Sequence, residues 1–239
     1  MGGRRSAPQG RRAQRRPDRR AAHPLSGGRG TATLRLTLAY DGTGLQGWQR
    51  QPGRPTVQGF VMDACARVLG GAVTVTGASR TDAGVHAIRQ VASLTTDAAL
   101  GAGELQRALN ALLPDAVRVT EVAAAPEGFN ARRSALGKRY GYCIDGGAVA
   151  DPFLRPYAWH RPRPLDVAAM RAGLARIRGK HDFSAFCAAP GRGRTPICTV
   201  RAVRLVARRE RLGIFVSADS FLHHMVRNLV GSLVEVGRG

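Results

Sequence analysis

Asp82 stands in a short loop of small and polar residues, 77–87, whose residue types suit chemistry. A β-branched run precedes the loop at residues 73–76, and a second mixed run follows at 88–96, so both flanks predict strands. Loops at strand ends present reactive side chains on a rigid scaffold. Arg80, two residues before the carboxylate, is close enough to hold it ionised. The alternative is an Asx-type turn in which Asp82 only caps its own loop.

Two histidines and an arginine, His223, His224 and Arg227, open a predicted helix near the end of the chain. Neighbouring residues on a helix point about 100° apart. No carboxylate follows at the spacing of a zinc protease. The sequence therefore predicts no metal site here. Tyr140 lies in an alternating run, residues 138–144, where a tyrosine taken alone is typical of a sheet core.

The charge of the chain points to a polyanionic partner. It has 37 Lys and Arg against 16 Asp and Glu, a formal net charge of +21, and only Lys138 and Lys180 are lysines. Arginine forks onto phosphate and stacks on bases, and each phosphate contact releases counterions. The charge therefore favours a nucleic acid as partner, although a bias of the genome toward Arg, Ala and Gly would contribute to it as well.

The remaining composition excludes several classes of protein. The four cysteines have no metal-binding spacing and read as reduced thiols. No apolar run approaches the ~20 residues of a membrane span. Residues 1–30 contain nine arginines and no apolar segment before a cleavage site, so they predict a disordered tail rather than a secretory signal. No cofactor motif is present. We expect a cytoplasmic protein without a cofactor and without membrane contact.

The predicted elements indicate an α+β fold. The first half reads strand, helix, strand, strand, helix, strand, which is typical of an antiparallel sheet with helices. Thr56 caps the first helix, which runs over residues 57–69 and is ended by Gly70. Trp48 suits either the core or an RNA-binding cleft. The other predicted elements are strands at 33–40, 116–125, 199–206 and 212–218, helices at 104–113 and 167–178, and a linking loop at 151–164.

The second half repeats this order, which predicts two similar α+β subdomains with mainly antiparallel sheets on either side of a basic cleft. We place the disordered tail at residues 1–30, the N-terminal subdomain with the Asp82 loop at 31–145, and the C-terminal subdomain at 146–239.

Several stretches, in the same order along the chain, resemble the tRNA pseudouridine synthases of the TruA type. The seven residues Arg-Thr-Asp-Ala-Gly-Val-His at 80–86 are similar to the nucleophile loop of that family. The resemblance runs from about Leu34 to Gly239. The other matching stretches are residues 40–42, 47–51, 134–140, 181–186, 194–196 and 221–228.

The resemblance implies a reaction and roles for individual residues. Asp82 would be the catalytic aspartate, Arg227 would keep it ionised, and Tyr140 would hold the target uracil. Arg80 would support the loop or fill the stack that the flipped base vacates. Contacts to RNA are expected from Lys138, Arg139, Arg194 and His223.

The implied substrate is tRNA, at uridines 38 to 40 of the anticodon stem-loop, and the implied assembly is a homodimer. The implied reaction is an isomerisation without cofactor or metal. Family members usually continue past the helix at the chain's end with another helix and a strand that closes the uracil pocket. The alternative is therefore a non-catalytic RNA-binding protein of the same fold. An aspartate-dependent hydrolase unrelated to RNA would need a second general acid near Asp82, and none is visible.

Overall fold

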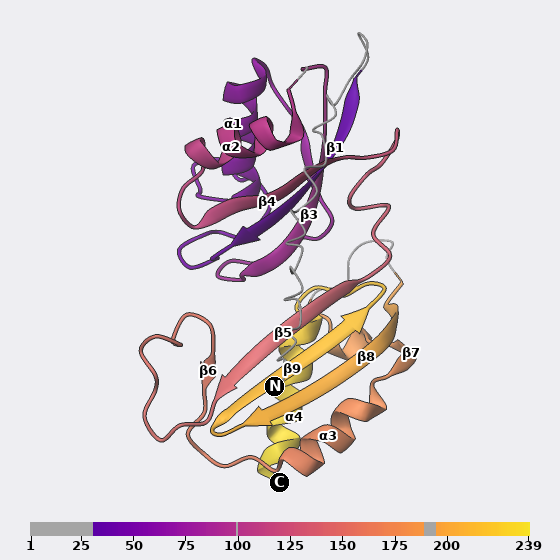
Figure 1. The fold of residues 1–239 in the computed structure, drawn as a ribbon. Coiled ribbons are helices and arrows are strands. Elements are labelled where there is room, and N and C mark those ends of the chain that lie inside the picture. Colours follow the sequence, from indigo (N-terminus) through magenta and orange to yellow (C-terminus); the bar gives the residue numbers. More distant parts are fainter. Residues whose placement is uncertain (1–30, 99, 189–194) are drawn as a thin grey trace, which may run out of the picture.

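The chain folds around two β-sheets, each covered by a pair of helices (Figure 1). The computed structural model describes residues 31–98, 100–188 and 195–239. The arginine-rich tail and Arg194 lie outside these described residues.

The first sheet has the strand order β2-β3-β1-β4, with every pair antiparallel. Its helices are α1 (Val57–Leu69) and α2 (Ala102–Leu112). We call this sheet with its two helices the first lobe. Its strands are β1 (Ala32–Tyr40), β2 (Val75–Gly77), β3 (Ala87–Thr96) and β4 (Val117–Ala124).

The second sheet has the order β6-β5-β9-β8-β7, and only the β5–β6 pair among the described strands is parallel. Its helices are α3 (Val167–Arg176) and α4 (Met225–Arg238). We call this sheet with its helices the second lobe. Its other elements are β5 (Lys138–Asp145), β6 (Trp159–His160), β7 (Gly179–Asp182), β8 (Ile197–Arg208), β9 (Arg211–Ala218) and the short 3-10 helix η1 (Ser184–Phe186).

The local signals in the sequence explain most element boundaries. The Thr56 hydroxyl accepts the backbone N–H of Gly59 at 3.3 Å and begins α1, and Gly70 ends it with φ 78° in the left-handed region. The predicted bounds of α1 are confirmed. In the second lobe, the Asp166 carboxylate accepts the N–H groups of Ala168 and Ala169 and begins α3.

Alternating apolar residues bury one face of each sheet. Leu34, Leu36 and Leu38 of the central strand β1 are fully buried against α1 and α2. Trp48 is only 2% exposed and belongs to this core, so its expected alternative role in an RNA cleft is wrong. The second lobe has its own core, where Ile214 and Val216 of β9 pack with residues of α3 and α4.

The element order confirms the α+β prediction, with two corrections. The strand β5, predicted to belong with the N-terminal subdomain of residues 31–145, pairs with β9 in the second sheet. Residues 151–164 form a linking loop as expected, but they also contain β6, which adds to the edge of β5. Cross-strand pairing over a long sequence separation decides sheet membership, and a single strand's pattern does not encode it.

The short strand before the Asp82 loop is displaced from its prediction. It was expected at residues 73–76, whereas β2 covers Val75–Gly77. Gly77 is required there because a Cβ would lie 2.4 Å from the buried indole of Trp48.

None of the helices in the described part of the chain has the length and apolar character that a membrane span needs.

Candidate active site

The Asp82 loop joins β2 to β3 and is fastened to the segment that follows β1. Trp48 donates its backbone N–H to the Thr81 carbonyl at 3.0 Å, and Gly84 donates to the Leu45 carbonyl at 3.2 Å. The Tyr40 hydroxyl bonds the Thr81 hydroxyl at 2.9 Å. At Gly47, φ is 81° and a Cβ would lie 2.5 Å from the Thr81 carbonyl oxygen, so only glycine fits. These contacts hold the backbone beside Asp82 in place.

The Asp82 carboxylate meets the beginning of α4 in the other lobe. Its Oδ2 atom lies 3.3 Å from Nε2 of His224 and 4.0 Å from the guanidinium of Arg227. The Asp82 side chain is 43% exposed. The N-terminus of a helix and a nearby cation both stabilise an ionised carboxylate. Two positive or proton-donating groups of one lobe therefore face a carboxylate of the other.

Tyr140 lies beside this contact in β5. Its hydroxyl is 3.1 Å from the Ser79 hydroxyl, and its ring meets Phe221 edge to face with centroids 4.9 Å apart. Burial raises the pKa of Tyr140 above its ordinary value; the Ser79 hydrogen bond opposes this rise and the negative charge of Asp82 adds to it. The ring is thus neutral near pH 7, partly exposed and held from two sides, which suits contact with a base.

The other predicted site residues are spread more widely. Arg80 is exposed and makes no ion pair with Asp82 within the described residues, so the carboxylate is met by His224 and Arg227 instead. His223 is exposed and stacks on His224 with ring centroids 3.8 Å apart. Lys138 and Arg139 begin β5 beside Tyr140. Arg194 lies outside the described residues.

The histidine pair corrects one premise of the sequence analysis. His223 and His224 precede α4 rather than lying on it, and His224 has φ 59°, in the left-handed region. Their ring nitrogens and the Asp82 carboxylate all lie within 4.8 Å of one another. The three side chains offer one nitrogen or oxygen ligand each, which is the donor set that binds first-row transition metals. The helical spacing argument against such a site is therefore wrong.

His224 is a functional candidate that the sequence analysis did not single out for contact with Asp82. It was discussed there only as a possible metal ligand, and the role in RNA binding was given to His223. The matching stretch 221–228 contains His224. The direction of its side chain depends on the left-handed backbone at His224 itself, and a non-glycine residue type does not predict that conformation.

A second contact between the lobes lies four residues along the same loop, at His86. Nε2 of His86 donates to the Pro156 carbonyl at 2.9 Å, and its ring lies against Tyr157 with centroids 4.8 Å apart. The Tyr157 hydroxyl donates to Asp41 Oδ2 at 2.6 Å. On the other oxygen of Asp41, Nδ1 of His86 is 2.9 Å away. Hydrogen bonds from Tyr157 and Thr43 hold the pKa of Asp41 well below its ordinary value.

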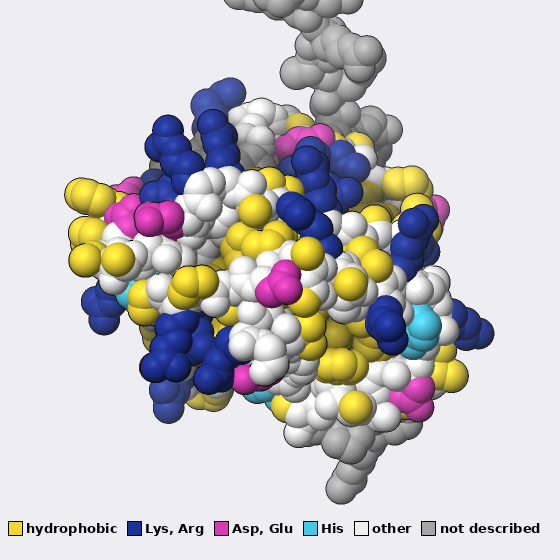
Figure 2. All heavy atoms as spheres, turned by 90° about the horizontal axis from the view of Figure 1, so that it is seen from below, with side chains coloured by type: hydrophobic (Ala, Val, Ile, Leu, Met, Phe, Trp, Pro, Cys, Tyr) yellow, Lys and Arg dark blue, Asp and Glu magenta, His cyan; other side chains and the backbone are white. Residues whose placement is uncertain are grey.

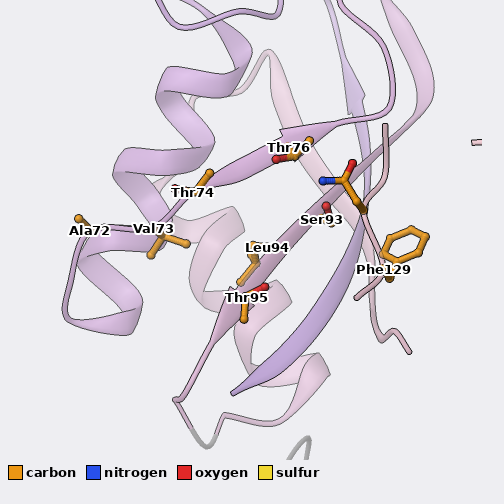
Figure 3. A pocket seen from close by; sticks show the side chains of 9 residues that line it. Ala72, Val73, Thr74, Thr76, Ser93, Leu94, Thr95 and Phe129 are labelled. Atoms are coloured by element: carbon orange, nitrogen blue, oxygen red, sulfur yellow. The ribbon is translucent and has the colours of Figure 1, made fainter. Parts of the chain in front are cut away.

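A separate pocket of about 370 Å³ lies on the first lobe, between β2, β3 and the chain at Phe129 and Asn130 (Figure 3). None of its lining residues belongs to the Asp82 contact.

The surface seen in Figure 2 has Lys and Arg side chains in several groups around apolar patches, with few acidic side chains between them. This distribution matches a net charge of +21. Phosphate contacts can therefore form at more than one place.

The comparisons with known proteins identify the family. The profile of the tRNA pseudouridine synthase family matches residues 37–132 and 174–239. Curated relatives named tRNA pseudouridine synthase A include those of Frankia casuarinae, 49% identical over 88% of this chain and 77% of the relative, and Methylacidiphilum infernorum, 44% identical over 86% and 81%. The relative from Solibacter usitatus is 40% identical over 86% of this chain and 87% of its own length. The chain belongs to the tRNA pseudouridine synthase family.

Proposed function

We propose that this protein isomerises uridine to pseudouridine in tRNA, at uridines 38 to 40 of the anticodon stem-loop, with Asp82 as the catalytic carboxylate. The observation that carries the proposal is the meeting of Asp82 with His224 and Arg227 across the two lobes, beside Tyr140. Family membership and the curated names of the relatives support the substrate and the reaction.

The reaction conserves every atom. The bond from N1 of uracil to C1′ of the ribose breaks, the base turns, and C5 bonds to C1′. The hydrogen on C5 leaves as a proton, and N1 ends protonated. No electron is transferred to or from the base, so the isomerisation itself needs no redox cofactor. Asp82 attacks the sugar or the pyrimidine, or abstracts a sugar proton; each of these steps requires an ionised carboxylate.

The site residues divide this work. The target base has to leave its stack, because its reacting atoms lie inside it. Tyr140 then holds the uracil by its ring, and Arg227 with His224 stabilises the Asp82 carboxylate. Arg80 supports the loop or fills the vacated stack, and Lys138, Arg139, Arg194 and His223 contact the RNA. Positive charge close to the phosphates stabilises the opened RNA.

In this proposal the protein is a homodimer and works in the cytoplasm, where its tRNA substrate is made and used. A dimer provides a surface wide enough for RNA that extends past one protomer. In the proposed dimer, Val149 and Phe153 of the loop between β5 and β6, which are 84% and 85% exposed, are candidates for the contact between protomers. Sedimentation equilibrium of the full chain measures the assembly, and a monomer mass at working concentration contradicts this part of the proposal.

The function is tested with the purified chain, an unmodified anticodon stem-loop RNA, a chelator and no added cofactor. Wild type should form pseudouridine at the target uridines. Asp82→Asn should lose at least about 10³-fold in rate, because the amide can neither attack nor accept a proton, while RNA affinity stays within about twofold. Asp97→Asn, an exposed carboxylate of the same lobe, is the matched control. Wild-type turnover by Asp82→Asn would show that the catalytic assignment is wrong.

A further inference from the structure

Within residues 31–98, 100–188 and 195–239, no element covers one face of the second sheet. Its helices α3 and α4 lie on one side, where Leu212, Ile214 and Val216 of β9 are buried (Figure 1). The residues between them in β9, Gly213 and Phe215 among them, point to the opposite side. We call that side the open face of the second sheet.

Phe215 lies flat on the open face because two glycines leave room for its ring. Gly141 is its cross-strand partner in β5, and Gly213 precedes it by two residues on β9. A Cβ at Gly141 would lie 3.1 Å from ring atom Cε1, and a Cβ at Gly213 would lie 3.0 Å from Cε2. Phe215 is nevertheless 41% exposed. One surface of the ring therefore covers backbone, and the other is available to a ligand.

Arginines surround the ring. Arg204 of β8 is the cross-strand partner of Phe215 on the side away from Gly141. Arg139 lies two residue pairs further along and therefore on the same face, opposite Ser217, whose hydroxyl accepts its Nε–H at 3.1 Å. Arg208 pairs with Arg211 at the far end of the same face. Of these four, only Arg211 forms an ion pair within the described part of the chain, with Asp151.

We propose that the open face of the second sheet binds single-stranded RNA, with one base stacked on Phe215 and the neighbouring phosphates on Arg204 and Arg139. An exposed aromatic ring on a sheet, framed by arginines, provides the two interactions that unpaired RNA needs. This surface is distinct from the active site, because the neighbouring side chain Tyr140 points to the opposite face of the same strand. The proposal rests on the proposed function in taking RNA as the ligand.

The open face holds an unpaired stretch of the tRNA while the target uridine occupies the contact between the lobes. Base stacking on an aromatic ring tolerates any base, so this surface adds affinity without selecting a sequence. A stem-loop RNA that lacks a single-stranded extension gains little from it, whereas full-length tRNA with its unpaired segments gains more.

The test compares Phe215→Leu with Phe215→Trp and with Val236→Ala, a control at an apolar residue of α4 that is 47% exposed. Leucine still covers the two glycines but offers no ring, and tryptophan restores a ring. For a short single-stranded oligouridylate, Phe215→Leu should bind about tenfold more weakly and Phe215→Trp at least as tightly as wild type.

A second measurement tests the phosphate contact through the salt dependence of binding. Arg204→Gln should lower the magnitude of the slope of log affinity against log salt concentration by about 0.7, and the control Arg107→Gln on α2 should leave this slope unchanged.

Two outcomes overturn the proposal. In the first, Phe215→Leu and Arg204→Gln bind the oligouridylate as wild type does. In the second, they leave RNA affinity unchanged and shift the sedimentation mass, which would make the open face a contact between two copies of the chain. Pseudouridine formation in the isolated stem-loop should persist in both variants. The function is tested separately, by the loss of pseudouridine formation in Asp82→Asn. A failure of one proposal can therefore be distinguished from a failure of the other.

Discussion

The segment from Asp82 to His86 touches the second lobe at both ends, and the two contacts differ in tightness. At the Asp82 end, the carboxylate lies 3.3 Å from His224 and 4.0 Å from Arg227. At the His86 end, the Asp41–His86–Tyr157 cluster has contacts of 2.6 to 2.9 Å, and His86 also bonds the Pro156 carbonyl. Strong hydrogen bonds to a charged group have the shorter distances.

This difference assigns a separate job to each end. In the proposed function, the His86 end fixes the orientation of the two lobes, and the Asp82 end keeps Arg227 and His224 at a distance that leaves room for a substrate. A carboxylate already clamped by two close hydrogen bonds would have to break them before reacting. The loop is therefore anchored at one end so that the other can stay open, and variants at the two ends should have opposite effects on activity and stability.

The largest effect is expected at the Asp82 end. Arg227→Gln removes the cation that faces Asp82 and should lower kcat/KM by about 10²-fold, because preorganised charge near a reacting group is worth that much. Its melting temperature should stay near that of wild type, since the Arg227 side chain is 54% exposed and the pair is long. Steady-state kinetics on the stem-loop RNA and thermal unfolding measure the two quantities.

Arg238→Gln provides the matched control, because Arg238 lies on the same helix and pairs with Glu235 at 2.8 Å. It should change neither quantity. If Arg227→Gln lowers the melting temperature and spares turnover, the Asp82 end is a structural contact and the comparison is wrong.

A substitution beneath the loop should affect both ends together. The backbone nitrogen of Gly42 lies 3.0 Å from Nδ1 of His86, and a Cβ at Gly42 would lie 2.3 Å from the Val85 carbonyl oxygen. Gly42→Ala must displace the loop, so we expect a loss of about 1–3 kcal/mol in the free energy of unfolding and a loss of turnover. Gly71→Ala is the control, since nothing lies within 4 Å of its added Cβ. Unchanged turnover in Gly42→Ala would show that the loop is not held from this side.

The elements around the site followed from local signals in the sequence, and the contacts between the lobes did not. Thr56 and Gly70 set the ends of α1, and the runs on both sides of Asp82 predicted strands there, although β2 begins two residues later than predicted. Asp82, Tyr140 and Arg227 were singled out through the resemblance of their motifs. Tyr157 was missed, because a tyrosine in a Pro- and Arg-rich loop carries no sign of its partner 116 residues away. Sheet membership of β5 was missed for the same reason, since pairing is a property of the folded chain.

The smallest effect is expected at the His86 end. Tyr157→Phe removes the hydroxyl that donates to Asp41, and it should lower the melting temperature by roughly 2–4 °C at pH 7. Turnover should fall by less than about threefold, because the stacked ring and the His86–Pro156 hydrogen bond remain. Tyr142→Phe is the control, because the Tyr142 hydroxyl forms no hydrogen bond with the described residues. Equal shifts in both variants would remove the special role of the Asp41–His86–Tyr157 cluster.

The effect of Tyr157→Phe should depend on pH in one direction. The pKa of folded Asp41 is lowered mainly by the Tyr157 hydrogen bond, so Asp41 stabilises the fold once it is ionised in both states, above its unfolded pKa of about 4. That stability is lost as the pH falls below this value toward the folded pKa. Tyr157→Phe brings the folded and unfolded pKa values closer, so its deficit should be full at pH 7 and shrink steadily below about pH 4. A deficit that stays constant down to the acid limit of the fold would mean that the hydroxyl acts by packing and not through the Asp41 charge.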